Sequence, residues 1–363
     1  MVRLLSQHQI KQGHSVWVLA NNVPGAREEF IKHHIQLIDD KGIKGYISPL
    51  FDFFHLFYWI YLIRKYAFDI VHTQTVKAGF MGRLAAKIAG TKQIIHSCHG
   101  YRLEGKFRFR IIEELYLLIE RCLSRITSVV AVQSHADYQT AIKHKIAPEK
   151  KLRIVYNGID ISAYEEQDKL RDRTLFRNEI GTDDETVVVG TVGRLTEAKA
   201  HKYLIDAAAR ILRKGRMKLK FAFIGDGPEK ESLKAQIEKY GFTDYFLFLN
   251  HRTDIPRIMQ GIDMHVLPSI REGFPIVLLE AMAAGKPCIT TDVGGSAEAV
   301  KDGVTGFVVP PRDSESLAKA IEVMIHDRTL MENMGKESAK RIRKEFTAEI
   351  MGNRMSDIYH SCV

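Results

Sequence analysis

Cysteine is scarce in this 363-residue chain, and long apolar runs are missing from it. The four cysteines show no metal-ligand spacing, so they predict neither a zinc site nor a disulfide framework. They indicate reduced thiols and therefore a cytoplasmic protein. No uninterrupted apolar run of about 18 residues occurs, so we expect no transmembrane helix. The opening residues MVRLLSQHQIKQG lack the apolar core of a secretion signal.

The second part of the chain has no excess of positive charge. Residues 1–165 contain 23 Lys and Arg against 14 Asp and Glu, and residues 166–363 contain 30 of each. A basic part beside a neutral part suggests an anionic partner surface, either a membrane or a nucleic acid. The alternative is a solvated surface with no partner. No nucleic-acid-binding signature is present, so we expect no nucleic acid.

Short apolar runs alternate with helix-like segments along the whole chain, and the length fits two domains. This alternation is typical of α/β domains with parallel sheets. The runs that predict strands are 15–20, 68–72, 94–97, 129–133, 187–192, 220–224, 246–249, 262–267 and 287–291.

The most informative stretch, LPSIREGFPIVLLEAMAA, follows the strand at 262–267. A loop with Glu272 and Gly273 leads through Phe274 into a predicted helix with Pro275 at its first position. Backbone N–H groups at such a helix start favour anions. Glu272 and Glu280 flank the helix start and could accept from hydroxyl groups. The combination suits a sugar nucleotide, and the alternative is an amphipathic helix with incidental glutamates.

A second cationic element follows the strand at 187–192. Gly193 permits a tight turn, Arg194 offers a planar fork for phosphate oxygens, and Lys199 offers a point charge. Both cations lie between a strand end and a helix that begins near His201. Two solvated surface cations are the alternative.

Two motifs and several longer segments resemble a known family. The spacing of Glu272 and Glu280 resembles the E-x7-E motif of retaining GT-B glycosyltransferases, and EGFP followed by LLEAMAAGKP resembles family 4 of that class. VGRLTEAKAHKYLIDAAARI and the run from FDIVH to HSCHG resemble the same family. The resemblance covers nearly the whole chain. It implies the GT-B fold, with two Rossmann-like, doubly wound domains facing a cleft.

The resemblance also implies roles for individual residues. Arg194, Lys199, Gly193 and the helix start at Gly273 and Phe274 would hold the diphosphate. Glu272 would accept from sugar hydroxyls and Glu280 from ribose hydroxyls. His99 would orient the donor sugar, and the loop that contains Arg252 would hold the nucleobase. No metal ion and no cofactor is expected.

The sequence departs from the family pattern in three places. Ala200 and Asn250 stand where the family usually has glycine. The chain begins on a predicted helix, so the first strand and glycine loop of the first domain are expected to be absent, with low activity as a result. We expect domain 1 at 1–165, domain 2 at 166–339, and a C-terminal helix, 340–363, packed back on domain 1.

The segment LFDFFHLFYWIYLIRKY at 50–66 is dense in aromatic residues. It fits an interfacial helix at a membrane surface or a core helix of the first domain. YRLEGKFRFR at 101–110 mixes basic and aromatic residues and fits the same anionic surface.

Together these features predict a retaining glycosyltransferase. The donor would be a UDP-hexose or UDP-N-acetylhexosamine, and the acceptor a lipid-linked saccharide at the inner face of the plasma membrane, in surface polysaccharide synthesis. A nucleotide-sugar epimerase of the same fold and a non-catalytic nucleotide- or carbohydrate-binding protein are the alternatives.

Overall fold

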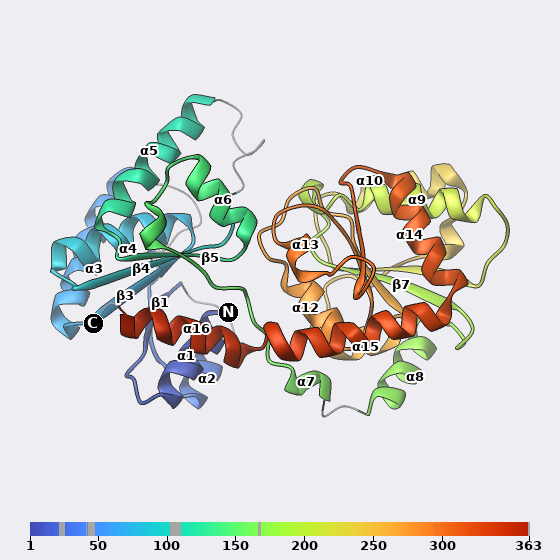
Figure 1. The fold of residues 1–363 in the computed structure, drawn as a ribbon, viewed down its shortest axis with the longest axis horizontal. Coiled ribbons are helices and arrows are strands. Elements are labelled where there is room, and N and C mark those ends of the chain that lie inside the picture. The colour runs from blue at the N-terminus through green and yellow to red at the C-terminus, as the bar shows by residue number, and fades with distance from the viewer. Residues whose placement is uncertain (22–25, 41, 43–47, 102–109, 166–167, 362–363) are drawn as a thin grey trace. The chain divides into compact units, whose positions relative to one another are not determined.

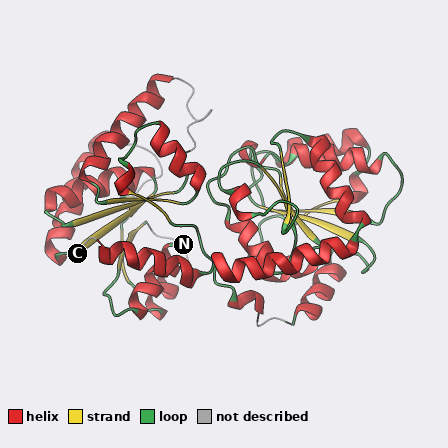
Figure 2. Ribbon diagram, viewed as in Figure 1, coloured by secondary structure: helices red, strands yellow, loops and turns green. Residues whose placement is uncertain are grey.

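The chain folds into two compact α/β units in a computed structural model (Figure 1). The structure describes residues 1–21, 26–40, 42, 48–101, 110–165 and 168–361. Unit 1 comprises Met1–Gly158 and Ala348–Val363, and unit 2 comprises Ile159–Thr347. Within each unit, parallel strands lie side by side between helices (Figure 2). The predicted pair of Rossmann-like domains is therefore confirmed.

Unit 1 contains a four-stranded parallel sheet and a separate parallel pair. The sheet has the order β3 (Ile70–Gln74), β4 (Gln93–Cys98), β5 (Val129–Val132) and β6 (Leu152–Ile154), and the pair is β1 (Trp17–Ala20) with β2 (Gln36–Asp39). Every residue of β4 and β5 is buried, as expected for a parallel sheet covered on both faces. In the described part of the chain no strand joins β1 to β3. The expectation that a strand of this sheet is absent stays a prediction.

Helices cover both faces of the unit 1 sheet. Successive residues of a strand point to opposite faces, so neighbouring residues of β5 pack against different helices. Val129 and Ala131 pack against α1 (Val2–Lys11) and α16 (Ala348–Ser361). Val130 and Val132 pack with α5 (Arg110–Ile126) and α6 (His135–Lys143) on the other face. The remaining helices of the unit are α2 (Ala26–Lys32), α3 (Pro49–Tyr66) and α4 (Val76–Ala89).

The unit boundaries lie at Gly158 and Ala348, against the expected positions 165 and 340. Helix α15 (Arg328–Glu345) buries Met331 and Met334 in the core of unit 2, so the segment 340–345 belongs to that unit. The segment that returns to unit 1 is α16 alone.

Unit 2 contains a six-stranded parallel sheet. Its order is β12 (Gly306–Val309), β11 (Cys288–Thr291), β10 (Met264–Leu267), β7 (Val187–Val192), β8 (Leu219–Ile224) and β9 (Phe246–Phe248). Its helices are α7 (Ser162–Glu165), α8 (Lys169–Glu179), α9 (Lys202–Leu212), α10 (Lys230–Tyr240), α11 (Ile255–Gly261), α12 (Ile276–Ala283), α13 (Ser296–Ala299), α14 (Ser314–His326) and α15. Because the strands are parallel, the loops that follow β7, β8, β10 and β11 leave the sheet at one edge.

Among the described residues, every helix is either too short or too polar to span a membrane.

A buried ion pair joins α4 to α5 in unit 1. Arg83 Nη2 lies 2.9 Å from both carboxylate oxygens of Glu120, and Arg83 Nε donates to the Gly79 carbonyl at 2.8 Å. The two side chains are 0% and 5% exposed. Removing one partner would leave the other charge buried without compensation.

Replacing Glu120 with alanine should therefore destabilise unit 1 by about 3–5 kcal/mol. Urea unfolding followed by tryptophan fluorescence measures this directly, since Trp17 and Trp59, the two tryptophans of the chain, both lie in unit 1. The matched control is Glu29→Ala, which removes an exposed partner of Arg3 within the same unit and should leave the unfolding midpoint nearly unchanged. An unchanged midpoint for Glu120→Ala would contradict the assignment.

Candidate functional site

Four loops of unit 2 meet at the carboxyl edge of its sheet. They follow β7, β8, β10 and β11. Backbone hydrogen bonds of 2.5–2.9 Å join them, from Gly193 N to Ile224 O, Leu195 N to Asp226 O, Ile270 N to Ala198 O and Gly295 N to Gly273 O. The loops thus form one connected surface at the edge where parallel α/β sheets bind ligands.

Glycines allow these loops to approach so closely. Gly225 has φ +142°, and a Cβ atom there would lie 1.9 Å from the Gly193 carbonyl oxygen. Gly294 has φ +52°, and a Cβ atom there would lie 2.2 Å from the Glu272 carbonyl oxygen. Side chains at either position would therefore separate the turn after β7 or the loop after β10 from its neighbour.

An ion pair connects the loop after β7 with the loop after β10. Lys199 Nζ lies 2.6 Å from Glu272 Oε1, and Ser269 Oγ donates to the same oxygen at 2.6 Å. The Lys199 and Glu272 side chains are 23% and 6% exposed. No partner for the other oxygen, Glu272 Oε2, is found in the described part of the chain. The structure thus brings together two predicted site residues that are 73 positions apart.

Arg194 is exposed and directly follows Gly193, in the same loop as Lys199. Gly193 has φ +153°, so the turn needs glycine there. For the Arg194 guanidinium, no hydrogen-bond or ion-pair partner is found within the described residues. The turn therefore presents an available cation at the same sheet edge as Lys199.

Two buried histidines lie near Lys199 without adding charge. Burial lowers the pKa of His265 to about 3, and the positive charge of Lys199 contributes further. Burial lowers the pKa of His201 to about 3 as well, again with a contribution from Lys199. Both rings are therefore neutral at physiological pH. His265 Nε2 accepts from the Val192 N–H at 3.3 Å and so supports the end of β7.

Helix α12 begins one residue later than expected, because Pro275 is its N-cap with extended backbone and Ile276 its first residue. Gly273 and Phe274 are buried. The Phe274 ring packs on Phe346 at 5.3 Å between ring centroids. The loop before α12 is thus fixed to the core of unit 2, and the positive end of the helix dipole is held at the sheet edge.

Glu280 lies in the middle of α12. Burial raises the pKa of its carboxyl group to about 7. The same carboxylate contributes, after burial, to the raised pKa of the buried Tyr164 hydroxyl, so these two side chains are neighbours. Glu280 is therefore a carboxyl group that changes charge near neutral pH.

Arg252, expected near the nucleobase, is already engaged within unit 2. Its Nε and Nη2 donate to the two oxygens of Asp254 at 2.8 and 2.7 Å, and its Nη1 donates to Glu179. These bonds, with a further one from Nη2 to Glu179, leave one Nη1 N–H for a nucleotide contact that displaces neither carboxylate. The prediction for Arg252 stays a prediction.

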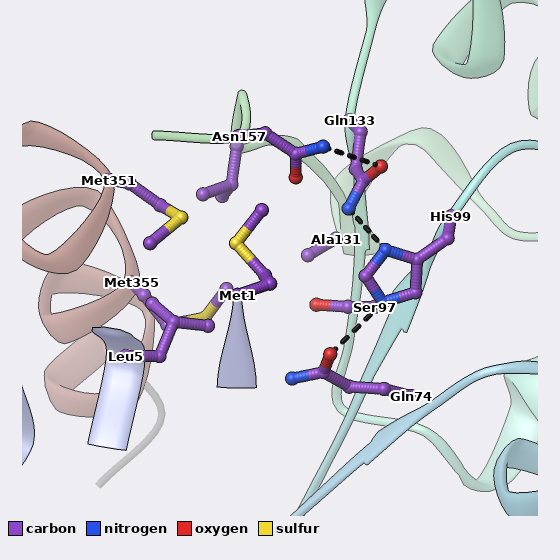
Figure 3. A pocket seen from close by; sticks show the side chains of 11 residues that line it. Met1, Leu5, Gln74, Ser97, His99, Ala131, Gln133, Asn157, Met351 and Met355 are labelled. Carbon is purple, nitrogen blue, oxygen red and sulfur yellow. Dashed lines mark hydrogen bonds between the residues drawn. The ribbon is translucent and has the colours of Figure 1, made fainter. Parts of the chain in front are cut away.

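His99 lies in unit 1, after β4, and side chains hold both of its ring nitrogens (Figure 3). Gln133 Nε2 donates to His99 Nδ1 at 2.5 Å, and His99 Nε2 donates to Gln74 Oε1 at 3.0 Å. Asn157 donates to Gln133 Oε1 at 3.3 Å, which fixes the orientation of the Gln133 amide. This series of hydrogen bonds selects the Nε2–H tautomer of His99.

A cavity of about 10 Å³ adjoins His99, between these polar groups and the side chains of Met351 and Met355 (Figure 3). This volume is about that of one water molecule and is too small for a sugar. A sugar hydroxyl could bond to a ring nitrogen of His99 only by displacing Gln74 or Gln133.

Sequence reasoning missed the residues that hold the predicted ones in place. No motif marks Ser269, although its hydroxyl contacts Glu272 three residues later. Gln74 ends β3 and Gln133 directly follows β5, and no local signal links them to His99. In the described residues, no group of three or more His, Cys, Asp or Glu side chains is placed to hold a metal ion.

This sheet edge and fold define a class of enzyme. Residues 172–341 match the family described as Glycosyl transferases group 1, and residues 1–163 match Glycosyltransferase Family 4. The chain belongs to this family of glycosyltransferases, and its fold is GT-B.

Named relatives from three bacteria share much of the chain. EpsD of Bacillus subtilis, named as a glycosyltransferase, is 31% identical over 82% of this chain and 78% of its own. The capsular polysaccharide biosynthesis glycosyltransferase CapM of Staphylococcus aureus is 27% identical over 98% and 96%. The UDP-Gal:alpha-D-GlcNAc-diphosphoundecaprenol alpha-1,3-galactosyltransferase of Escherichia coli is 29% identical over 82% and 76%.

Solved structures agree on the fold. Anabaena HepE in complex with UDP and glucose has a TM-score of 0.83 at 23% identity, over 99% of this chain and 95% of its own. Sucrose-phosphate synthase from Thermosynechococcus elongatus has a TM-score of 0.83 at 21% identity, over 99% and 92%. At these identities the likeness establishes the fold alone.

The close approach of Gly225 to Gly193 can be tested against a matched glycine. Gly215 has φ +147°, nearly the angle of Gly225, but a Cβ atom there meets nothing within 4 Å. The alanine variants should have similar backbone strain, and only Gly225→Ala also places a Cβ atom against backbone atoms. We expect Gly225→Ala to be less stable than Gly215→Ala by about 1–3 kcal/mol. Thermal unfolding followed by circular dichroism measures the difference, and equal losses would refute the close-approach argument.

Proposed function

We propose that this protein transfers a hexose or N-acetylhexosamine from a UDP-sugar to a lipid-linked saccharide, with retention of anomeric configuration and without a metal ion. The reaction would take place at the cytoplasmic face of the membrane, in surface polysaccharide synthesis. The names of CapM and of the Escherichia coli galactosyltransferase support the pathway, the UDP donor and the lipid-linked acceptor. The observation that carries the proposal is the Lys199–Glu272 ion pair, with the exposed cation of Arg194 in the same loop as Lys199.

Lys199 and Arg194 fit the diphosphate of such a donor. An ammonium group has three N–H donors, and Lys199 uses one on Glu272, which leaves donors for phosphate oxygens. Arg194 adds a planar fork for the same oxygens. Negative charge grows on the leaving phosphate as the glycosidic bond breaks, so these cations stabilise the transition state more than the ground state. The start of α12 adds its dipole.

Glu272 and Glu280 fit the hydroxyl groups of the donor. Lys199 and Ser269 fix Glu272 through Oε1, so Oε2 remains for a sugar hydroxyl. Glu280 would accept from the ribose hydroxyls. His99 would orient the sugar, with a sugar hydroxyl replacing Gln74 or Gln133 at the ring. No side chain is assigned as a nucleophile. The acceptor oxygen would bond to the anomeric carbon on the face from which the phosphate departs, and the phosphate would take the acceptor proton.

A donor panel tests the function. Purified protein is incubated with UDP-, GDP- and ADP-linked hexoses and N-acetylhexosamines, with a short-chain polyprenyl diphosphate saccharide and with EDTA present. We expect transfer from a UDP-sugar to a product whose anomeric configuration, determined by NMR, matches the donor. An inverted product would contradict retention, and loss of transfer in EDTA would contradict metal independence. Interconversion of the free UDP-sugar would indicate an epimerase, and UDP binding without turnover a non-catalytic protein.

Arg194→Ala and Lys199→Ala should each lower kcat by about 10²–10³, the effect of removing one charged donor from a transition state. Both variants should keep the circular dichroism spectrum of the wild type. Lys202→Ala is the matched control, because Lys202 is an exposed cation in the first turn of α9. Near wild-type rates for both site variants would refute the phosphate role.

UDP affinity should depend on the charge of Glu280. With a pKa of about 7, the carboxyl group is mainly protonated at pH 6 and mainly ionised at pH 8. The ionised form is the better acceptor for ribose hydroxyls, so UDP should bind about tenfold more tightly at pH 8. The ionisation of UDP itself affects wild type and the Glu280→Gln variant alike, but the variant lacks the titrating carboxyl group. Calorimetric titrations of both proteins separate the two effects, and an identical pH dependence would rule out the role of Glu280.

A further inference from the structure

The outward face of α3 is a continuous apolar stripe. Its members recur every three or four residues, which places them on one side of the helix, and all are exposed. They are Leu50, Phe53, Phe54, Phe57, Tyr58 and Tyr61. Leu50 is 79% and Phe54 70% exposed. The Phe53 ring meets those of Phe54 and Phe57 edge-on at 5.7 and 5.2 Å between centroids, so the aromatic surface is unbroken.

The inward face of α3 already has its partners. Trp59 and Ile60 are buried together with Met81 and Ala85 of α4. The polar residues of the helix are also engaged within unit 1, since His55 Nε2 lies 2.7 Å from Asp40. The sequence left open whether this helix belongs to the core or to an interface. In the structure one face of α3 is buried in unit 1 and the opposite face is exposed.

Cations continue the stripe at its C-terminal end. Arg64 and Lys65 follow Tyr61 by one turn and are exposed. Lys65 Nζ lies 5.8 and 5.2 Å from the ring centroids of Tyr61 and Tyr66, within the range of cation–π attraction. The face thus changes from apolar to aromatic to cationic along its length.

A second apolar stripe lies on α5, where Ile111, Leu115 and Leu118 are exposed at helical spacing. Helix α4 packs against both α3 and α5 (Figure 1). In unit 2, the exposed large apolar side chains of the described residues are aliphatic and scattered over several elements: Leu170, Leu175, Ile276, Val304 and Val323. The concentration of exposed apolar surface is therefore a property of unit 1.

We propose that the α3 stripe, extended by the stripe on α5, docks unit 1 on a bilayer with anionic headgroups. Aromatic and aliphatic side chains would enter the acyl boundary, and Arg64 and Lys65 would meet the headgroups. The proposal rests on the proposed function, whose acceptor is lipid-linked. The excess of basic residues in 1–165 matches an anionic membrane, whereas a second copy of this chain would present the same positive charge.

Vesicle co-sedimentation tests the docking surface. The wild-type protein should bind vesicles of phosphatidylethanolamine and phosphatidylglycerol, and the double variant Phe54→Ser/Phe57→Ser should bind at least about tenfold more weakly. Leu170→Ser is the matched control, because it removes a 74% exposed apolar side chain from unit 2 and should leave binding unchanged. Circular dichroism and UDP affinity, which should not change, verify the fold of each variant.

The cations can be examined separately. Arg64→Ser/Lys65→Ser should weaken binding to the anionic vesicles but not to vesicles of phosphatidylcholine alone. The difference between wild type and this variant should shrink as salt is added, since salt screens exposed charges.

Several results would overturn the docking surface. These are wild-type protein that does not sediment with the anionic vesicles, a double phenylalanine variant that binds as tightly as wild type, or a wild-type dimer that the variant converts to a monomer without any vesicle binding. Transfer to an acceptor embedded in vesicles should fall in the variant, whereas transfer to the short-chain soluble acceptor should not. Vesicle binding without transfer to either acceptor would count against the proposed function alone.

Discussion

The ion pair between Lys199 and Glu272 is the contact on which the arrangement of the unit 2 sheet edge depends. It connects the loop after β7 with the loop after β10, and the Ser269 hydroxyl donates to the same carboxylate oxygen. Because Oε1 of Glu272 is held by two hydrogen bonds, the direction of Oε2 is fixed as well. Lys199 uses one N–H group on Glu272 and has two further N–H donors. One interaction therefore prepares both a cation for an anionic group and an acceptor for a hydroxyl group, without rearrangement when a ligand arrives.

Backbone geometry supports the same edge and explains where this chain departs from its family. Ala200 has φ +51° and Asn250 has φ +54°, in the left-handed region where glycine is free of strain. These are the two positions at which glycine is usual in the family. Asparagine tolerates this region comparatively well, and alanine less so. The loop conformations are thus kept although the residues differ, and neighbouring hydrogen bonds, such as Gly225 N to Asn250 O at 2.7 Å, hold them.

The sequence predicted most strands correctly because strands such as β5 and β7 are almost entirely buried and consist mainly of apolar residues. It missed β2, β6 and β12; the residues of β2 and β6, QLID and LRI, are partly exposed and form no continuous apolar run. Arg194, Lys199, Glu272 and Glu280 could be named from motif spacing. Their supports could not, because contacts such as Gln133 to His99 join separate strands. Helix α3 is apolar all round, so its periodicity could not tell the buried face from the exposed one.

The return of α16 to unit 1 has a consequence for how the protein is made. Leu5, Ile95 and Val129 are buried against Met351, Met355 and Ile358, which follow unit 2 in the chain. Unit 2 is one continuous segment, 159–347, and all of it is synthesised before this helix. Domains generally fold in the order of their synthesis. Here the order is partly reversed: unit 1 is translated first but completes its core only after unit 2 has been synthesised. Until then, chaperones would meet the unit 1 sheet with α1 but not α16 on one of its sides.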